Sequence, residues 1–287
     1  SAAFLNEAVN QLAEAYLERK QRETGESIPH DAYLAERQKV KMFLADNNVF
    51  GVDLNPVAVE LAEISLWLNT IFEGNYVPWF GLQLTTGNSL IGARREVFES
   101  SLLEKKGKGE DTWLNTVPER VGWDEDSRSS KSVYHFLLPD MGMANYQDKV
   151  IKRLEPHAIS RINDWRRQFC KPFSKSDIKV LERLSLAVDR LWVEHAEQLA
   201  RIRETTTDQL PVWGHGGEAE IEQSDMANKD RMLEQEILSR DVRNSSPYRR
   251  LKLAMDYWCA LWFWPIAEYD ELPERDDFLL ELQYILE

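Results

Sequence analysis

Cysteine and long apolar runs are both scarce in this chain of 287 residues. Its only cysteines, Cys170 and Cys259, lie far apart, so they supply neither a disulfide framework nor a four-cysteine zinc site. The longest apolar run, 258–266, has nine residues, whereas a membrane-spanning helix needs about 20. The first residues carry no basic and apolar stretch of the secretory type. We therefore expect no membrane anchor and a reducing, cytoplasmic location.

Basic residues are in deficit. The chain has 35 lysines and arginines against 49 aspartates and glutamates, which gives a net charge of -14. This balance counts against a self-sufficient nucleic-acid binder, which usually presents a basic face. It is compatible with a chain that is part of a larger DNA-acting protein whose basic groove lies elsewhere. Hydrophobic residues make up 43% and charged residues 29%, as in an ordinary globular protein of one or two domains.

The first third of the chain predicts alternating helices and short strands. Apolar residues recur at helical spacing over 4–23 and 31–46, and a short strand is expected over 48–54. A helix over 57–72 and a second strand over 82–86 follow. A strand, a helix and a strand joined by short links are the unit of a parallel, doubly wound sheet.

The rest of the chain predicts a different organisation. Residues 96–144 are polar and irregular and are interpreted as a linker, whereas 145–287 are interpreted as a helical insert domain. The expected fold class is therefore α/β plus all-α: a partial Rossmann-like sheet within 1–95, then a mainly helical domain, helix-rich overall. Helices are expected at about 145–169, 174–205, 225–243, 246–262 and 276–286.

Asp53 is the most informative single residue, because it ends the first predicted strand. A carboxylate at the carboxyl end of such a strand faces the ligand crevice and can accept hydrogen bonds from two ribose hydroxyls. Asn55 and Pro56 follow it and would shape the edge of that pocket. The alternative is that Asp53 only caps the helix that begins at Pro56, as aspartate before a proline-led helix often does.

Three runs carry a resemblance to a known family. Residues 50–56, Phe-Gly-Val-Asp-Leu-Asn-Pro, with Ala58, Glu60 and Ala62, resemble the second motif of adenine-specific DNA methyltransferases that use S-adenosyl-L-methionine. Residues 87–92, Gly-Asn-Ser-Leu-Ile-Gly, resemble the third motif, with asparagine where many relatives have aspartate. Residues 1–5, Ser-Ala-Ala-Phe-Leu, resemble the tail of the first motif. The resemblance is closest to the large enzymes of restriction-modification, BREX and DISARM-type phage defence.

The resemblance implies a cofactor site for S-adenosyl-L-methionine and a set of partners. The partners would be double-stranded DNA, bound through the full-length parent, the remaining domains of the same polypeptide, and restriction or defence subunits. The five histidines show no ligand spacing, so we expect no metal site. The implied cofactor-binding residues are Asp53, Leu54, Asn55, Pro56, Asn88, Ser89, Leu90 and Phe4.

One motif of that family has no counterpart in the chain. No Asn-Pro-Pro-aromatic or Asp-Pro-Pro-aromatic run occurs, and in the family this motif holds the amino group of the flipped adenine. The glycine-rich loop under the methionine part of the cofactor is missing too. We therefore expect a fragment of an N6-adenine methyltransferase with no catalytic residues of its own. By itself it should bind the cofactor weakly or not at all.

A helical interaction or scaffold module without catalytic activity is the alternative from another class. Long charged helices, an acidic balance and ten tryptophans suit the docking of a partner protein. A basic cluster at Arg161, Arg166 and Arg167 could touch DNA phosphates. Acidic residues interleave with it, so a mixed-charge surface is the alternative there.

Overall fold

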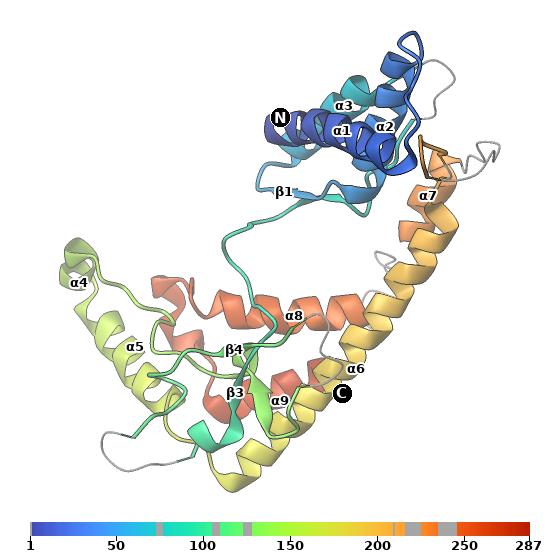
Figure 1. Cartoon of the computed structure of the whole chain (residues 1–287). Helices are drawn as coiled ribbons and strands as arrows, with labels where there is room; N and C mark the ends of the chain where they lie inside the picture. The colour runs from blue at the N-terminus through green and yellow to red at the C-terminus, as the bar shows by residue number, and fades with distance from the viewer. Residues whose placement is uncertain are drawn as a thin grey trace. The chain divides into compact units, whose positions relative to one another are not determined.

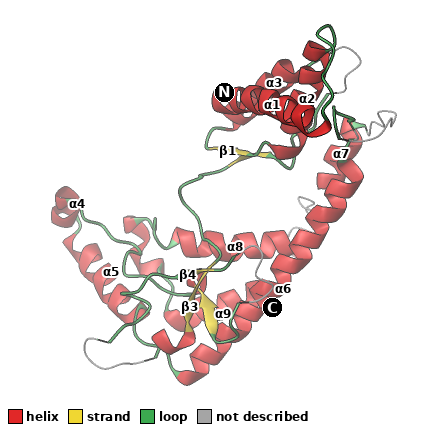
Figure 2. Ribbon diagram, in the orientation of Figure 1, coloured by secondary structure: helices red, strands yellow, loops and turns green. Residues whose placement is uncertain are grey.

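A computed structural model shows a chain of two compact units, which are described separately (Figure 1). The first unit combines Ser1–Leu90 with Leu199–Leu238, and the second combines Ile91–Gln198 with Ser239–Glu287. Helices make up most of the described chain (Figure 2), which confirms the helix-rich prediction. The structure describes residues 2–72, 77–104, 110–122, 128–208, 210–215, 225–234 and 246–287.

Three helices form the body of the first unit. α1 (Ala3–Thr24), α2 (Tyr33–Asn48) and α3 (Pro56–Thr70) pack against one another. Buried side chains of these helices and of the segments packed against them form two apolar clusters. One contains Val9, Ala45, Val49, Ala62, Leu66, Phe80 and Leu84, and the other contains Ala13, Leu17, Ile28, Val40, Met42, Leu210 and Val212.

Two short parallel strands lie beside these helices. β1 (Gly51–Asp53) pairs with β2 (Leu84–Thr86), with Gly51 opposite Leu84 and Asp53 opposite Thr86. α3 connects the two strands, as the sequence predicts. Within the described residues the parallel sheet consists of this pair. It is therefore one strand-helix-strand unit, and its place in a larger Rossmann-like sheet stays a prediction.

Local side chains explain where α3 begins. The side-chain oxygen of Asn55 accepts a hydrogen bond from the Val57 N–H at 3.0 Å, and Pro56 occupies the first turn. An asparagine cap satisfies one of the amide groups that a helix start leaves unpaired, and proline there loses no hydrogen bond. Asn55, and not Asp53, is therefore the N-cap of α3.

The first unit is completed by a segment that returns late in the chain. It contains the end of α6 (Lys175–Thr206) and α7 (Met226–Leu233). Lys229 of α7 forms a buried ion pair with Asp208, and the Trp79 indole donates to Asp230 at 2.7 Å. The sequence predicts a first domain that ends at residue 95, and it does not predict that this later segment joins the same unit. The predicted helix 225–243 ends at Leu233 in α7, and 235–243 lie outside the described residues.

The second unit contains a small antiparallel sheet where the sequence predicts an irregular linker over 96–144. β3 (Glu96–Glu99) lies between β4 (Glu119–Arg120) and β5 (Ser132–Tyr134). Two to four residues per strand are too few to show a period-2 pattern in the sequence. Their apolar residues are nevertheless buried, among them Val97, Phe98, Val133 and Tyr134. The segment is therefore part of a core and does not act as a linker.

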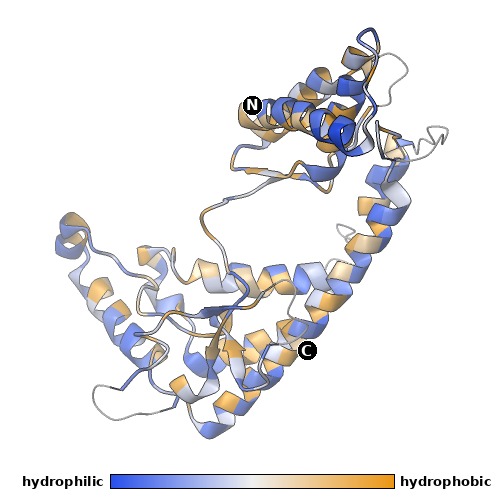
Figure 3. Ribbon diagram, in the orientation of Figure 1, coloured by the Kyte–Doolittle hydropathy of each residue, from blue (hydrophilic) through white to orange (hydrophobic). Residues whose placement is uncertain are grey.

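Helices surround this sheet. α4 (Lys149–Leu154), α5 (Pro156–Phe169), α8 (Pro247–Ala260) and α9 (Arg275–Leu286) join the first part of α6, on which hydrophobic and hydrophilic residues alternate (Figure 3). The single helix predicted over 145–169 is broken at Pro156, because proline lacks the N–H of an interior helix position. Short 3-10 helices occur at Ser100–Leu102, His135–Leu137 and Ile266–Glu271.

Tryptophan side chains tie loops to the core of the second unit. Trp113 donates its indole N–H to Pro139 O at 2.9 Å, Trp258 donates to Leu138 O at 2.9 Å, and Trp165 donates to Pro273 O at 2.7 Å. Each ring buries apolar area while its one polar group finds a carbonyl. Among the described helices, none combines the length and the apolar character needed to cross a bilayer.

Candidate functional site

The carboxyl ends of β1 and β2 bring two predicted motifs together. Gly87 follows β2 and donates its N–H to the backbone carbonyl of Asp53 at 2.9 Å. The loop 87–90 therefore lies directly beside the end of β1. Ligands of open parallel sheets bind at this end of the strands. The motif residues 53–56 and 87–90 thus share one edge of the first unit, as a cofactor site requires.

A small hollow of about 90 Å³ lies along β1 and reaches Asp53 at the end of that strand. Asp53 lines it, together with Leu5 of α1 and the small residues Ala58 and Ala62 of α3. Gly51 keeps the walls close, because a Cβ atom there would lie 2.9 Å from Leu84 Cδ2. The alanines and Gly51 line the hollow with small groups, a signal that spacing in the sequence alone did not single out.

The Asp53 carboxylate is exposed and takes part in a local turn. Its Oδ1 atom accepts a hydrogen bond from the Asn55 N–H at 2.9 Å. Because Asn55 is the helix cap, the alternative interpretation of Asp53 as the cap of α3 is wrong. A carboxylate has about four lone-pair positions, so this single bond leaves capacity for acceptance from ribose hydroxyls.

Asn88 repeats this arrangement after β2. Its side-chain oxygen accepts a hydrogen bond from the Leu90 N–H at 2.9 Å, and Asn88, Ser89 and Leu90 are all exposed. Asn88 and Asp53 each fold back on the residue two positions ahead, which presents both side chains at the loop tips. An amide offers a donor and an acceptor to an adenine edge.

The remaining predicted residues lie at the surface around the hollow. Leu54 and Pro56 are exposed at the start of α3. Phe4 is 92% exposed on α1 and does not line the hollow, whereas its neighbour Leu5 does. The segment that resembles the first motif therefore lies beside the hollow through Leu5, and the role of Phe4 in cofactor binding stays a prediction.

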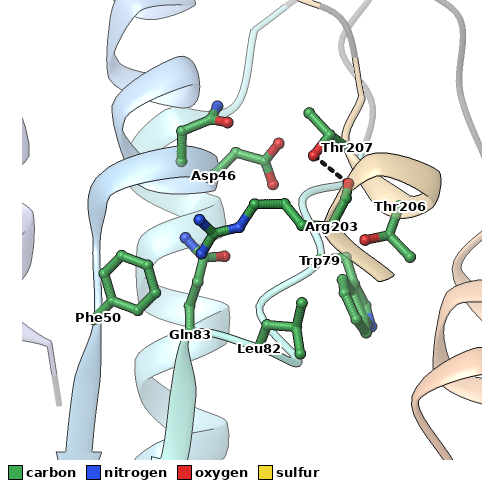
Figure 4. A pocket seen from close by; sticks show the side chains of 9 residues that line it. Asp46, Phe50, Trp79, Leu82, Gln83, Arg203, Thr206 and Thr207 are labelled. Carbon is green, nitrogen blue, oxygen red and sulfur yellow. Dashed lines mark hydrogen bonds between the residues drawn. The ribbon is translucent and has the colours of Figure 1, made fainter. Parts of the chain in front are cut away.

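A second hollow, also about 90 Å³, lies at the opposite end of the strands. Figure 4 shows the Arg203 side chain of α6 reaching toward Asp46, Phe50 and Gln83. The guanidinium carbon lies 5.9 Å from the centre of the Phe50 ring. Phe50 precedes β1 and Gln83 precedes β2, so this hollow faces the amino ends of the strands, where ligands of parallel sheets do not bind. We assign Arg203 to the anchoring of α6.

The predicted basic cluster splits into structural and surface residues. Arg166 is buried and donates to the carbonyls of Met143 and Ala144 at 2.7 and 2.6 Å. Arg167 pairs with Asp164 on the surface. Arg166 therefore stabilises the loop at Met143 and Ala144. At Arg167 the surface carries charges of both signs.

Two titratable side chains of the second unit are uncharged at neutral pH. Burial raises the pKa of the Cys170 thiol to about 12, so it stays protonated at neutral pH. Burial lowers the pKa of His135, whose ring packs edge-on against Trp258. Across the described ranges, no cluster of three or more histidine, cysteine or acidic side chains could hold a metal ion.

Comparison with known proteins gives no match: no family model fits the chain, and neither a curated protein nor a solved structure matches it. Function has to be argued from the residues and geometry above.

Proposed function

We propose that the first unit is the S-adenosyl-L-methionine-binding part of an adenine-specific (N6) DNA methyltransferase of the large restriction-modification or phage-defence type. The observation that carries the proposal is the exposed Asp53 carboxylate at the carboxyl end of β1, beside a hollow lined by small residues and next to the loop 87–90. A carboxylate there is suited to the two hydroxyls of an adenosyl ribose.

The proposal assigns a role to each loop. Asp53 would accept hydrogen bonds from the ribose, and Asn88 would meet the edge of the adenine. Leu54 and Leu90 project apolar side chains into water at the two loop tips. An adenine ring between these loops would remove that apolar area from water, which stabilises a complex by about 25 cal/mol per Å².

The site described is only part of such a pocket. Its volume of about 90 Å³ is well below the roughly 300–1,000 Å³ typical of ligand pockets. The chain also has no Asn-Pro-Pro-aromatic motif to hold a flipped adenine. In this proposal, methyl transfer and binding of double-stranded DNA belong to a longer protein in the cytoplasm, and this chain alone is inactive.

The test is titration of the chain with S-adenosylhomocysteine, the stable product that remains when the cofactor has lost its methyl group, followed by ligand-observed NMR. We expect weak binding, and Asp53→Asn should lower the affinity about 5- to 10-fold, the worth of roughly one hydrogen bond. Asp31→Asn, which changes an exposed aspartate ahead of α2, is the matched control. Sub-micromolar binding would contradict the partial pocket. Binding unchanged by Asp53→Asn, or no binding at millimolar ligand, would contradict the site.

Protein interaction is the second candidate function, because one face of α3 is apolar and exposed. Val57, Leu61 and Leu68 all lie at this face and are more than half exposed. Contiguous exposed apolar surface of this kind marks interaction sites in soluble proteins.

A further inference from the structure

α3 carries apolar residues on two sides. One side buries Ala62 and Leu66 in the core of the first unit. The other side presents a line of exposed residues spaced by four, three and four positions, which places them on one helical face. We call this line the α3 stripe: Val57, Leu61, Ile64 and Leu68, exposed to 56%, 54%, 50% and 60%. A helix with two apolar sides is typical of one that is covered on both.

An aromatic pocket of about 250 Å³ adjoins the α3 stripe and shares Ile64 with it. The pocket lies between α3, the segment 77–81 and α7 of the same unit. Its walls combine the rings of Trp67, Trp79 and Phe80 with the carboxylates of Glu63 and Asp230. Aromatic faces and carboxylates attract the same class of ligand, an organic cation.

Trp79, which forms one wall of the aromatic pocket, is held in place by a hydrogen bond and by close packing. Trp79 is buried and donates its indole N–H to Asp230 Oδ1 at 2.7 Å. Its ring packs on Gly81, where a Cβ atom would lie only 2.5 Å from Trp79 Cζ2. Any other residue at position 81 would therefore displace the ring. The wall and one carboxylate are thus oriented before any ligand arrives, which lowers the cost of binding.

The α3 side of the pocket is acidic. Residues 51–90 contain four aspartates and glutamates and no lysine or arginine. Burial raises the pKa of the Glu63 carboxyl, and the negative charges of Glu60 and Asp230 raise it further. Two like charges beside a partly buried carboxyl cost free energy that a bound cation would recover.

We propose that the aromatic pocket receives the lysine or arginine side chain of a partner protein, whose apolar side chains cover the α3 stripe. The proposal develops the interaction function and is independent of cofactor binding. The occupant is a segment that carries a basic residue next to apolar ones, since only such a segment complements both features. A second copy of the chain, docked through its own stripe, would bring Glu60 and Glu63 close to the same negatively charged residues of the first copy. Nucleic acid would meet the same negative charges.

The pocket is tested with a pair of probes that differ in charge but hardly in shape. N-acetylarginine methylamide is the cation, and N-acetylcitrulline methylamide is its neutral analogue. The indole N–H signals of Trp67 and Trp79, assigned by single Trp→Phe variants, report binding in NMR spectra of the whole chain. We expect saturable shifts of both signals with the arginine probe and at least fivefold weaker binding of the citrulline probe. Equal affinities, or shifts at neither tryptophan, would overturn the proposal.

Variants separate this site from the cofactor site. Glu63→Gln keeps the shape of the side chain and should lower the affinity for the arginine probe at least threefold. Glu26→Gln, in an exposed loop, should leave that affinity unchanged. Glu63→Gln should not change the affinity for S-adenosylhomocysteine, and Asp53→Asn should not change the affinity for the arginine probe. If the wild-type chain binds only one of the two ligands, the ligand that does not bind identifies which proposal fails.

The α3 stripe is tested by selection from a random peptide library against the wild-type chain, with binding then measured to Leu61→Ser. Peptides that combine lysine or arginine with apolar residues, and that lose at least tenfold affinity for Leu61→Ser and for Glu63→Gln, support the proposal. Acidic peptides, or peptides indifferent to both variants, overturn it. Sedimentation that shows a dimer abolished by Leu61→Ser, or nucleic-acid binding lost in that variant, would assign the stripe to another occupant.

Discussion

Asp53 and Asp208 are aspartates of the same unit, yet burial gives them different roles. Asp53 is exposed at the end of β1 and accepts one hydrogen bond from a nearby amide. Asp208 is 5% exposed and pairs with Lys229. An exposed carboxylate remains available to a ligand, whereas a buried one must keep its partner because an uncompensated charge is costly inside a protein.

His135 should make the second unit sensitive to mild acid. Its Nε2 atom lies 2.9 Å from the Arg94 amide nitrogen. Burial lowers the pKa of His135 and outweighs the opposing charges of Glu96 and Asp140. A histidine whose folded pKa is lowered binds fewer protons in the folded state than in the unfolded state. The free energy of unfolding therefore falls as the pH drops through the unfolded pKa of about 6.5.

The measurement is urea denaturation of the wild type and of His135→Gln at pH 7 and pH 5. We expect the wild type to lose more stability between these pH values than the variant does. His157→Gln is the control, because His157 lies at an exposed contact with Tyr269. An equal loss in the wild type and in His135→Gln would contradict a half-buried histidine that is neutral in the folded state.

Local sequence patterns predict some of the individual residues correctly and others not. The sequence placed Asp53 and Asn88 at strand ends, and both lie at loop tips beside each other's loop. It could not distinguish Asp53 from Asn55 as the helix cap, because both are good caps and lie two positions apart. It also placed Arg166 among surface charges, although that side chain is buried, since burial depends on neighbours far along the chain.

At the scale of elements, caps and proline set the bounds of the helices. Asp148 caps α4, Asn55 caps α3 and Asp225 caps α7, each by accepting amide hydrogen bonds from the first turn. Pro156 separates α4 from α5. These signals act within a few residues, so the bounds of α6, α8 and α9 could be predicted to within a few positions.

Asn55→Ala should destabilise the first unit by about 1 kcal/mol, because the α3 start loses its cap. The affinity for S-adenosylhomocysteine should change little, because the bond to Asp53 comes from the backbone N–H of residue 55, which alanine keeps. Thermal denaturation and the ligand titration measure the two effects. Asn55→Asp, which can cap equally well, should restore stability. A variant Asn55→Ala as stable as the wild type would show that the cap contributes nothing.

At the scale of the whole molecule, the chain is not divided into consecutive pieces. Leu199–Leu238 belong to the same unit as the first 90 residues. The Tyr16 hydroxyl donates to Trp213 O at 3.0 Å, and Trp79 donates to Asp230, so side chains of the first part hold the returning segment. The buried pair Asp208 and Lys229 lies within this segment.

Lys229→Met should therefore destabilise the first unit by roughly 3–5 kcal/mol, because Asp208 would be left buried without its cation. Lys229 is only 2% exposed. Lys252→Met is the control, because its ion pair with Asp256 is exposed and lies within one helix, and such pairs contribute about 0.3–0.5 kcal/mol. Urea denaturation followed by tryptophan fluorescence compares the two. Similar effects of both substitutions would show that the buried pair is not essential.

The sequence by itself determined the helices, the strand-helix-strand unit and the position of the polar loops, because helical hydrogen bonds, caps and turns join residues only a few positions apart. The tertiary structure alone decided that Glu96–Glu99, Glu119–Arg120 and Ser132–Tyr134 pair in a small sheet and that α7 returns to the first unit. It also decided that an acidic, aromatic pocket forms beside the α3 stripe. Strand pairing and burial join residues far apart in the chain, so no local pattern records them.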